Sequence, residues 1–214
     1  MSRATNFFAI GEYYHLYNRG VDKRKIFSSN HDRDRFLSLL YICNSATPIH
    51  RSNFTNDSLH HLLVINRGEL LVDIGAYCLM PNHFHLLIKE RTENGISTFM
   101  QKLSTAYTMY FNKLHKRSGT LFQGRFKAKH LGDDNYLKYI FAYIHLNPLN
   151  AGGLHTMRSL VSYQYSSYAD YAQEDLRIPE GSIINKSAFP EYFLQPEDFS
   201  RHLEEWFTYG KVEP

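Results

Sequence analysis

The 214-residue sequence contains only two cysteines, Cys43 and Cys78, which excludes a disulfide framework and favours a reducing compartment such as the cytoplasm. It also lacks any apolar run near the ~18 residues of a membrane-spanning helix, because the longest candidates, 62–65 and 86–88, are strand-sized. Residues 1–12 lack the basic and then apolar pattern of a signal peptide. We therefore expect a cytoplasmic protein with a core of its own and no membrane partner.

Carboxylates are absent between Glu93 and Asp133, and all the charged residues in that stretch are basic. They are Lys102, Lys113, Lys116, Arg117, Arg125, Lys127 and Lys129. The net charge of +3 is too small to indicate a nucleic-acid partner by itself. Aromatic residues are interleaved with these cations, however, and that combination suits a polyanion with faces for stacking. A solvated basic helix and strand would have the same composition, so both interpretations stay open.

The spacing of apolar residues predicts an α+β fold. Short aromatic-rich or alternating runs predict strands at 13–18, 69–79, 83–89 and 125–131. Helical spacing predicts helices at 32–43, 96–116, 133–147 and 196–207, with a polar loop at 45–56. Pro148 and the Gly152-Gly153 pair are expected to end the third helix. This order predicts an antiparallel sheet with helices packed on it, over residues 1–158, followed by a partly helical C-terminal extension at 159–214.

A histidine pair stands at the start of the strand predicted at 83–89, directly after the turn-prone Met80-Pro-Asn82 connection of an antiparallel hairpin. His83 and His85 are two residues apart, so on a strand they share one face. Two imidazoles whose backbones lie about 7 Å apart can hold one divalent metal ion, but the site needs a third ligand from elsewhere. The alternative is a pair of half-exposed histidines that bind nothing.

The helix predicted before Pro148 carries a polar stripe that can supply this ligand. Tyr139, Tyr143 and Asn147 are spaced by four residues and therefore lie along one side of the helix. Tyr143 offers a phenol oxygen and Asn147 a neutral oxygen ligand for a hard metal ion. The alternative is that Tyr143 is a core aromatic residue whose hydroxyl is satisfied by a neighbour.

Five short motifs follow one another along the chain. They are Tyr14-His-Leu-Tyr-Asn-Arg-Gly20, Tyr77-Cys-Leu-Met-Pro-Asn-His-Phe-His-Leu-Leu87, Leu121-Phe-Gln-Gly-Arg-Phe126, Tyr143-Ile-His-Leu-Asn-Pro148 and Tyr165-Ser-Ser-Tyr168. Over about residues 10–170, their order and spacing resemble the REP-associated tyrosine transposases, a bacterial branch of the HUH single-tyrosine transposase superfamily. The resemblance implies a ferredoxin-like (HUH/RRM-like) arrangement of the antiparallel sheet.

The resemblance also implies an enzyme that cleaves and rejoins single-stranded DNA by transesterification. Tyr143 matches the nucleophile of the superfamily, whose phenolate forms a 5′-phosphotyrosine link and releases a 3′-hydroxyl. His83, His85 and Asn147 match its metal ligands. Mg²⁺ or Mn²⁺ suits such a site, which must keep positions open for phosphate and water.

The DNA partner implied by the resemblance is a single strand that carries an imperfect REP-type (BIME-like) hairpin. Two basic groups are candidates to contact its phosphates: Arg125, Lys127 and Lys129 with Lys113, Lys116 and Arg117, and the cluster Arg19, Lys23 and Arg24 after the first strand. Two rival functions stay open. The first is a non-catalytic regulator that binds DNA hairpins, and the second is a metal-dependent hydrolase that uses water as its nucleophile.

Overall fold

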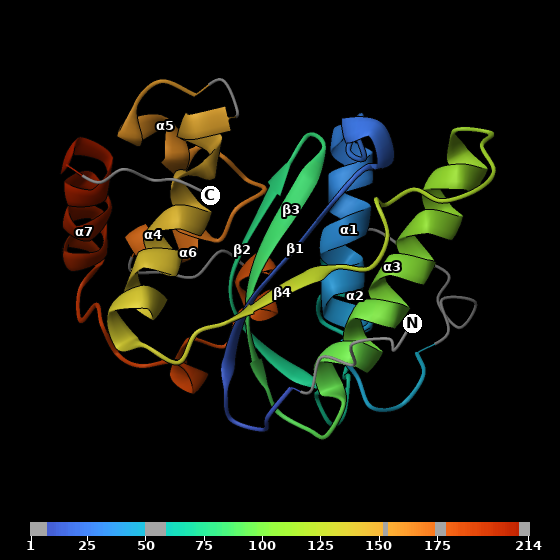
Figure 1. The fold of residues 1–214 in the computed structure, drawn as a ribbon, viewed down its shortest axis with the longest axis horizontal. Coiled ribbons are helices and arrows are strands. Elements are labelled where there is room, and N and C mark those ends of the chain that lie inside the picture. The colour runs from blue at the N-terminus through green and yellow to red at the C-terminus, as the bar shows by residue number, and fades with distance from the viewer. Residues whose placement is uncertain (1–7, 50–58, 152–153, 174–178, 210–214) are drawn as a thin grey trace, which may run out of the picture.

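The computed structural model describes residues 8–49, 59–151, 154–173 and 179–209, and its centre is one antiparallel sheet (Figure 1). The strands are β1 (Tyr13–Arg19), β2 (Val72–Met80), β3 (His83–Glu90) and β4 (Lys127–His130), in the spatial order β2-β3-β1-β4. Each strand is antiparallel to its neighbours, and β2 and β3 form the predicted hairpin. With one helix after β1 and one after β3, this is the ferredoxin-like β-α-β-β-α-β arrangement, so the predicted α+β fold is confirmed.

Helices α1 (Asn30–Ile42) and α3 (Gly95–Leu114) cover one face of the sheet, on the right in Figure 1. Alternate residues of the strands, among them Leu16 and Phe84, point into the core beneath these helices and are almost wholly buried. The ring of Phe84 packs 4.9 Å from that of Phe36 on α1. This face therefore holds the larger hydrophobic core, and the turn η1 (Val21–Lys23) and α2 (Leu59–Leu62) lie at its margin.

Helix α4 (Asp134–Ala151) lies against the opposite face of the sheet, on the left in Figure 1. Phe141 and Ile144 from this helix pack with Cys78 and Leu87 from β2 and β3 in a second, smaller apolar cluster. Beside this cluster, β1 and β3 bring polar side chains such as His15 and His85 to the same face. No helix that the structure describes is long and apolar enough to cross a membrane.

From Met157 on, the described residues pack on α4, on the outer edge of β2 and, through Ile183 and Ile184, in the core beside α1. They form α5 (Met157–Val161), α6 (Tyr168–Ala172), η3 (Glu180–Ile183), η4 (Lys186–Ala188) and α7 (Pro196–Tyr209). Ala142 and Leu146 of α4 share an apolar cluster with Phe199 and Leu203 of α7. Residues 165–167 run beside β2, where the Leu79 N–H donates to the Tyr165 carbonyl at 2.9 Å and the Ser167 N–H to the Tyr77 carbonyl at 3.0 Å.

Most element boundaries differ from the sequence prediction by one to four residues; β2, for example, begins at Val72 and not at residue 69. Helix α1 begins at Asn30, two residues early, because the Ser29 hydroxyl accepts from the Asp32 N–H at 3.2 Å and the Asp32 carboxylate accepts from the Ser29 N–H in return. Strand β4 begins at Lys127 and not at residue 125. Helix α4 runs past Pro148 to Ala151, because a proline in the last turn removes only one hydrogen bond. Residues 50–58, from the predicted loop, and the Gly152-Gly153 pair lie outside the described residues.

Candidate active site

The pairing of the strands places a polar row on the face of the sheet beneath α4. Tyr17 on β1 stands opposite His85 on β3 and also opposite Lys127 on β4. Two residues further along β1, on the same face, Arg19 stands opposite His83. Directly paired residues of neighbouring strands share a face, so these five side chains emerge on the same side of the sheet.

A cavity of about 430 Å³ opens over this row. Its lining residues are Tyr17, Asn18, Arg19, His83, His85, Gln123, Arg125, Lys127 and Tyr143. The sheet supplies the histidines, and α4 supplies Tyr143 from above. The structure thus brings the predicted histidine pair, the predicted tyrosine and three of the predicted cations to one cavity.

Both imidazoles of the pair are held through their Nδ1 atoms. His85 Nδ1 lies 2.9 Å from Nε2 of His15 on β1, and His83 Nδ1 lies 2.7 Å from Oδ1 of Asn82. The two rings are 5.0 Å apart between centroids and perpendicular at 88°. A polar partner at one ring nitrogen fixes the orientation of a histidine and leaves the other nitrogen as the ligating atom, as at metal sites in general.

The imidazoles of this cluster are neutral at pH 7. Burial lowers the pKa of His85 well below its usual value, and the neighbouring His15 and His83 lower it further. Burial, assisted by the charge of Lys129, lowers the pKa of His15 to about 4. Burial also lowers the pKa of His83, although a hydrogen bond to Asn147 opposes that shift. A neutral imidazole is the form that binds a metal ion.

Tyr143 and Asn147 lie one helical turn apart on α4, beside the histidines. The Tyr143 ring stands edge-on to His85, with centroids 5.3 Å apart at 90°. The Asn147 amide donates to the Tyr143 carbonyl at 2.9 Å. Asn147 also lies close enough to the His83 ring and to the Tyr143 phenol to oppose the pKa shift of each. Tyr143 is only 8% exposed, and burial raises its pKa, an effect that Asn147 opposes and Tyr17 reinforces. The phenol is therefore protonated at pH 7 and needs activation to act as a nucleophile.

The donor set fits a divalent cation. Among the described residues, no three His, Cys, Asp or Glu side chains are grouped to hold an ion, so a third protein ligand here would be an amide. Asn147 lies near His83, outside the cavity lining, and carries such an oxygen. Two imidazole nitrogens and one amide oxygen would leave positions open for phosphate and water, which suits Mg²⁺ or, because of the imidazoles, Mn²⁺.

The predicted cations fall into two spatial groups. Arg19, Arg125 and Lys127 are exposed and line the cavity. Lys129 lies on the same face, with its ammonium 4.4 Å above the ring of Tyr136 on α4. Three of these residues therefore rim the histidine cavity, and Lys129 stands outside its lining, opposite His15.

The other predicted cations lie outside the lining of the cavity. Lys113 and Lys116 are exposed at the end of α3, and Arg117 donates to Asn112 there at 2.7 Å. Lys23 is the last residue of the turn η1, and Arg24 follows it. Backbone contacts connect this turn to residues 121–122: Gly20 forms a β-bridge with Phe122, and the Val21 N–H donates to the Leu121 carbonyl at 3.0 Å.

Five residues of the site were not predicted from the sequence: His15, Tyr17, Asn18, Asn82 and Gln123. The alternation of β1 places His15 and Tyr17 on one face, but only the pairing of β1 with β3 places that face beside the histidine pair. Gln123 joins the cavity because its N–H donates to the Arg19 carbonyl at 2.9 Å. The signal available in the sequence was the polar and aromatic alternation within 13–19.

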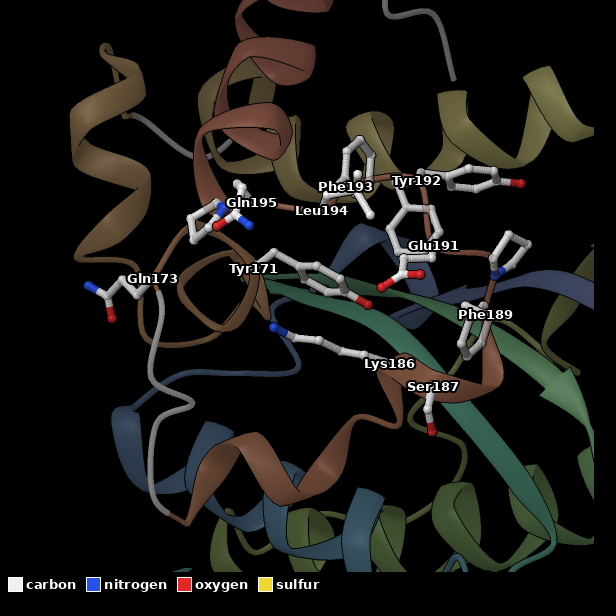
Figure 2. Close-up of a pocket in the computed structure, with 13 residues that line it drawn as sticks. Tyr171, Gln173, Lys186, Ser187, Phe189, Glu191, Tyr192, Phe193, Leu194 and Gln195 are labelled. Carbon is white, nitrogen blue, oxygen red and sulfur yellow. The ribbon is translucent and has the colours of Figure 1, made fainter.

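A second cavity, of about 710 Å³, is lined by residues from the last part of the chain together with Phe141 of α4 (Figure 2). Tyr171, Lys186, Phe189 and Tyr192 line it, and the Lys186 ammonium lies 4.8 Å from the centre of the Tyr171 ring. None of the site residues predicted from the sequence lines this cavity. The histidine cavity is therefore the candidate active site.

Together, fold and site define a ferredoxin-like α+β protein whose open sheet face carries a histidine pair beneath a tyrosine-bearing helix. Residues 11–147 match the family model of the IS200-like transposases. The match covers more than half of the chain, which therefore belongs to this family, and the family predicted from the motifs is confirmed.

The fold is also similar to that of a solved structure, a REP-associated tyrosine transposase bound to a REP hairpin. The TM-score is 0.57 and the sequence identity 12%, and the alignment covers 90% of this chain and 99% of that one. At this identity the similarity shows the shared fold. No curated protein matches the sequence significantly.

Proposed function

We propose that this protein cleaves and rejoins single-stranded DNA beside a REP-type hairpin, with Tyr143 as the nucleophile. Membership of the IS200-like transposase family supports a transposase that acts on DNA. The structure with a similar fold was solved with a REP hairpin, which supports a DNA hairpin as the partner. The observation that carries the proposal is the position of the Tyr143 ring. Its centroid lies 5.3 Å from that of His85, in a cavity that is also lined by cations.

The proposed reaction exchanges one phosphate ester for another. The Tyr143 oxygen attacks the phosphorus and loses its proton to solvent, while the bond from phosphorus to the 3′-oxygen breaks. The 3′-oxygen keeps the bonding electron pair and takes up a proton, and the 5′ end remains joined to the protein as a phosphotyrosine. Since the number of ester bonds is unchanged, the 3′-hydroxyl of another strand can reverse the step without ATP.

The residues around Tyr143 prepare this attack. His83, His85 and Asn147 would hold a divalent cation that neutralises charge on the phosphate and favours the phenolate. His15 and Asn82 hold the two imidazoles through Nδ1. The exposed cations Arg19, Arg125 and Lys127 would bind the phosphates on either side of the scissile bond.

A covalent-adduct assay tests the proposal. The protein is incubated with a single-stranded oligonucleotide that carries a REP-type hairpin, in the presence of Mn²⁺ or Mg²⁺, and resolved on a denaturing gel. We expect an adduct with the unmodified protein, none with Tyr143→Phe, and equal hairpin binding by both. Tyr139→Phe is the matched control, since Tyr139 is one turn earlier on α4 and packs on Trp206, outside the cavity lining.

The same assay separates the rival functions. Hairpin binding without cleavage under either cation would favour the non-catalytic regulator. Cleavage that persists in Tyr143→Phe without an adduct would favour the hydrolase with a water nucleophile. Either outcome refutes Tyr143 as the nucleophile.

A further inference from the structure

Tyr17 is a second tyrosine in the candidate active site, and the proposed chemistry does not use it. It is half-exposed in the middle of the cavity floor, on the strand between the one that carries His85 and the one that carries Lys127. Its ring lies 5.8 Å from that of His85 and 5.1 Å from that of His15, tilted by 30° and 32°. The ring is therefore supported by two imidazoles and open to the cavity.

The surroundings of Tyr17 indicate which part of a DNA strand would lie there. The histidine pair marks the position of the scissile phosphate, and Lys127 offers a cation for a neighbouring phosphate. Adjacent strands of a sheet lie about 4.8 Å apart, so these two anchors are about 10 Å apart with Tyr17 between them. A strand that connects the two phosphates must pass its sugar and base over the Tyr17 ring.

The chemistry of the Tyr17 side chain favours a base over a phosphate as its contact. Among the residues that the structure describes, none hydrogen-bonds to the Tyr17 hydroxyl, so packing alone holds the ring. The Lys127 ammonium lies 6.0 Å from the ring centroid. An aromatic face beside a cation is the usual platform for an unpaired base, because every base offers a π-face for stacking.

We infer that Tyr17 stacks on the base of the nucleotide next to the scissile phosphate and so positions that phosphate between His85 and Tyr143. This inference rests on the proposed function, because it takes the histidine cavity as the place of cleavage. Tyr17 is then a positioning residue that selects an unpaired nucleotide and leaves the identity of the base free.

A binding experiment with 2-aminopurine tests the inference without cleavage. Full-length Tyr143→Phe protein is titrated into hairpin oligonucleotides that carry 2-aminopurine at one position at a time on both sides of the cleavage site. Stacking quenches this base, so we expect strong quenching at one position. Adding Tyr17→Phe keeps the quenching, whereas Tyr17→Leu removes it and weakens binding of the single-stranded part by about 5- to 100-fold.

An abasic substitution makes the test specific to the base. With an abasic site at the quenched position, Tyr17 and Tyr17→Leu proteins should bind equally, because no base remains to stack. Tyr13→Leu is the matched control: Tyr13 is on the same face of β1, but it packs on Phe189 and lies outside the cavity lining. It should leave the quenching intact.

Three results would overturn the inference. The first is an equal loss of quenching and affinity in Tyr17→Phe and Tyr17→Leu, which would assign the contact to the hydroxyl. The second is quenching that survives in Tyr17→Leu. The third is weaker binding by the Tyr17→Leu protein that persists with the abasic oligonucleotide. The adduct assay tests the proposed function separately: if the unmodified protein forms no adduct, the proposed function is refuted. Quenching requires binding but no cleavage, so it tests the role of Tyr17 independently of that outcome.

Discussion

The two faces of the sheet are built from the same strands, yet they differ in nearly every physical property. On β3, Phe84 is 1% exposed and packs between Phe36 and Phe122, with ring centroids 4.9 and 5.9 Å away. Its neighbours on both sides, His83 and His85, point to the other face and line the candidate active site. Because side chains alternate along a strand, a one-residue step separates a residue of the hydrophobic core from those that line the candidate active site.

The largest effect on stability is expected at Phe84. Phe84→Ala should lower the free energy of unfolding by about 3–5 kcal/mol, because it removes a buried ring from between two others. Chemical denaturation followed by circular dichroism measures this change. The control is His83→Ala, for which we expect a loss under about 1 kcal/mol since the side chain is half-exposed. Similar losses for both variants would contradict the division between the faces.

The second prediction concerns His83, which neighbours Phe84 on β3 but lies on the other face, and here we expect the large effect on activity and not on stability. His83→Ala should reduce the rate of adduct formation by about 100-fold or more, because it removes a proposed ligand of the cation that stabilises the transition state. Single-turnover kinetics at saturating DNA measure the rate, and hairpin affinity should stay within about 2-fold. If the rate were unchanged in the folded variant, His83 would have no part in the reaction.

The third prediction returns to the core face, at the cap of α1. Ser29→Ala removes the hydroxyl that accepts from the Asp32 N–H and should cost about 1 kcal/mol of stability. Adduct formation per folded molecule should not change, because α1 covers one face of the sheet (Figure 1) and the histidine pair lies on the other, beneath α4. Thermal unfolding and the adduct assay on the same sample check both statements.

The smallest effect is expected for single cations. Lys127→Ala should weaken binding of a single-stranded oligonucleotide about 3-fold and reduce the salt dependence of the affinity by about 0.7 in log–log slope, the contribution of one phosphate contact. Lys113→Ala is the matched control, because Lys113 is exposed on α3, across the sheet from the cavity. Fluorescence anisotropy at several salt concentrations measures both. An equal change in slope for the two lysines would contradict the assignment of the site to one face.

Local patterns in the sequence predict much of this architecture. The His-x-His spacing and the tyrosine and asparagine four residues apart on a helix are properties of single elements, and both are present on β3 and α4. The meeting of His15 with His85 depends on strand pairing across 70 residues, which no local pattern encodes. For the same reason, Lys113 and Lys127 belong to one basic stretch of sequence but lie on different sides of the sheet.

The C-terminal part of the chain also makes a contact that no local pattern in the sequence predicts. His145 is fully buried on the side of α4 away from Tyr143, where its Nε2 lies 2.8 Å from the hydroxyl of Ser167. The helical spacing of α4 predicts that His145 points away from Tyr143, but the partner comes from a segment with little periodicity. Sequence reasoning therefore gives the direction of the side chain and not the contact it makes.

The two outer strands of the sheet also bear on how copies of the protein behave in solution. Residues 165–167 cover the outer edge of β2, whereas β4 is only four residues long and exposes Lys127 and Lys129. An open strand edge invites pairing with the edge of another molecule, and charged side chains on a short strand prevent it. We therefore expect the two lysines on β4 to oppose edge-to-edge aggregation as well, and a variant with both replaced by apolar residues to self-associate in size-exclusion chromatography.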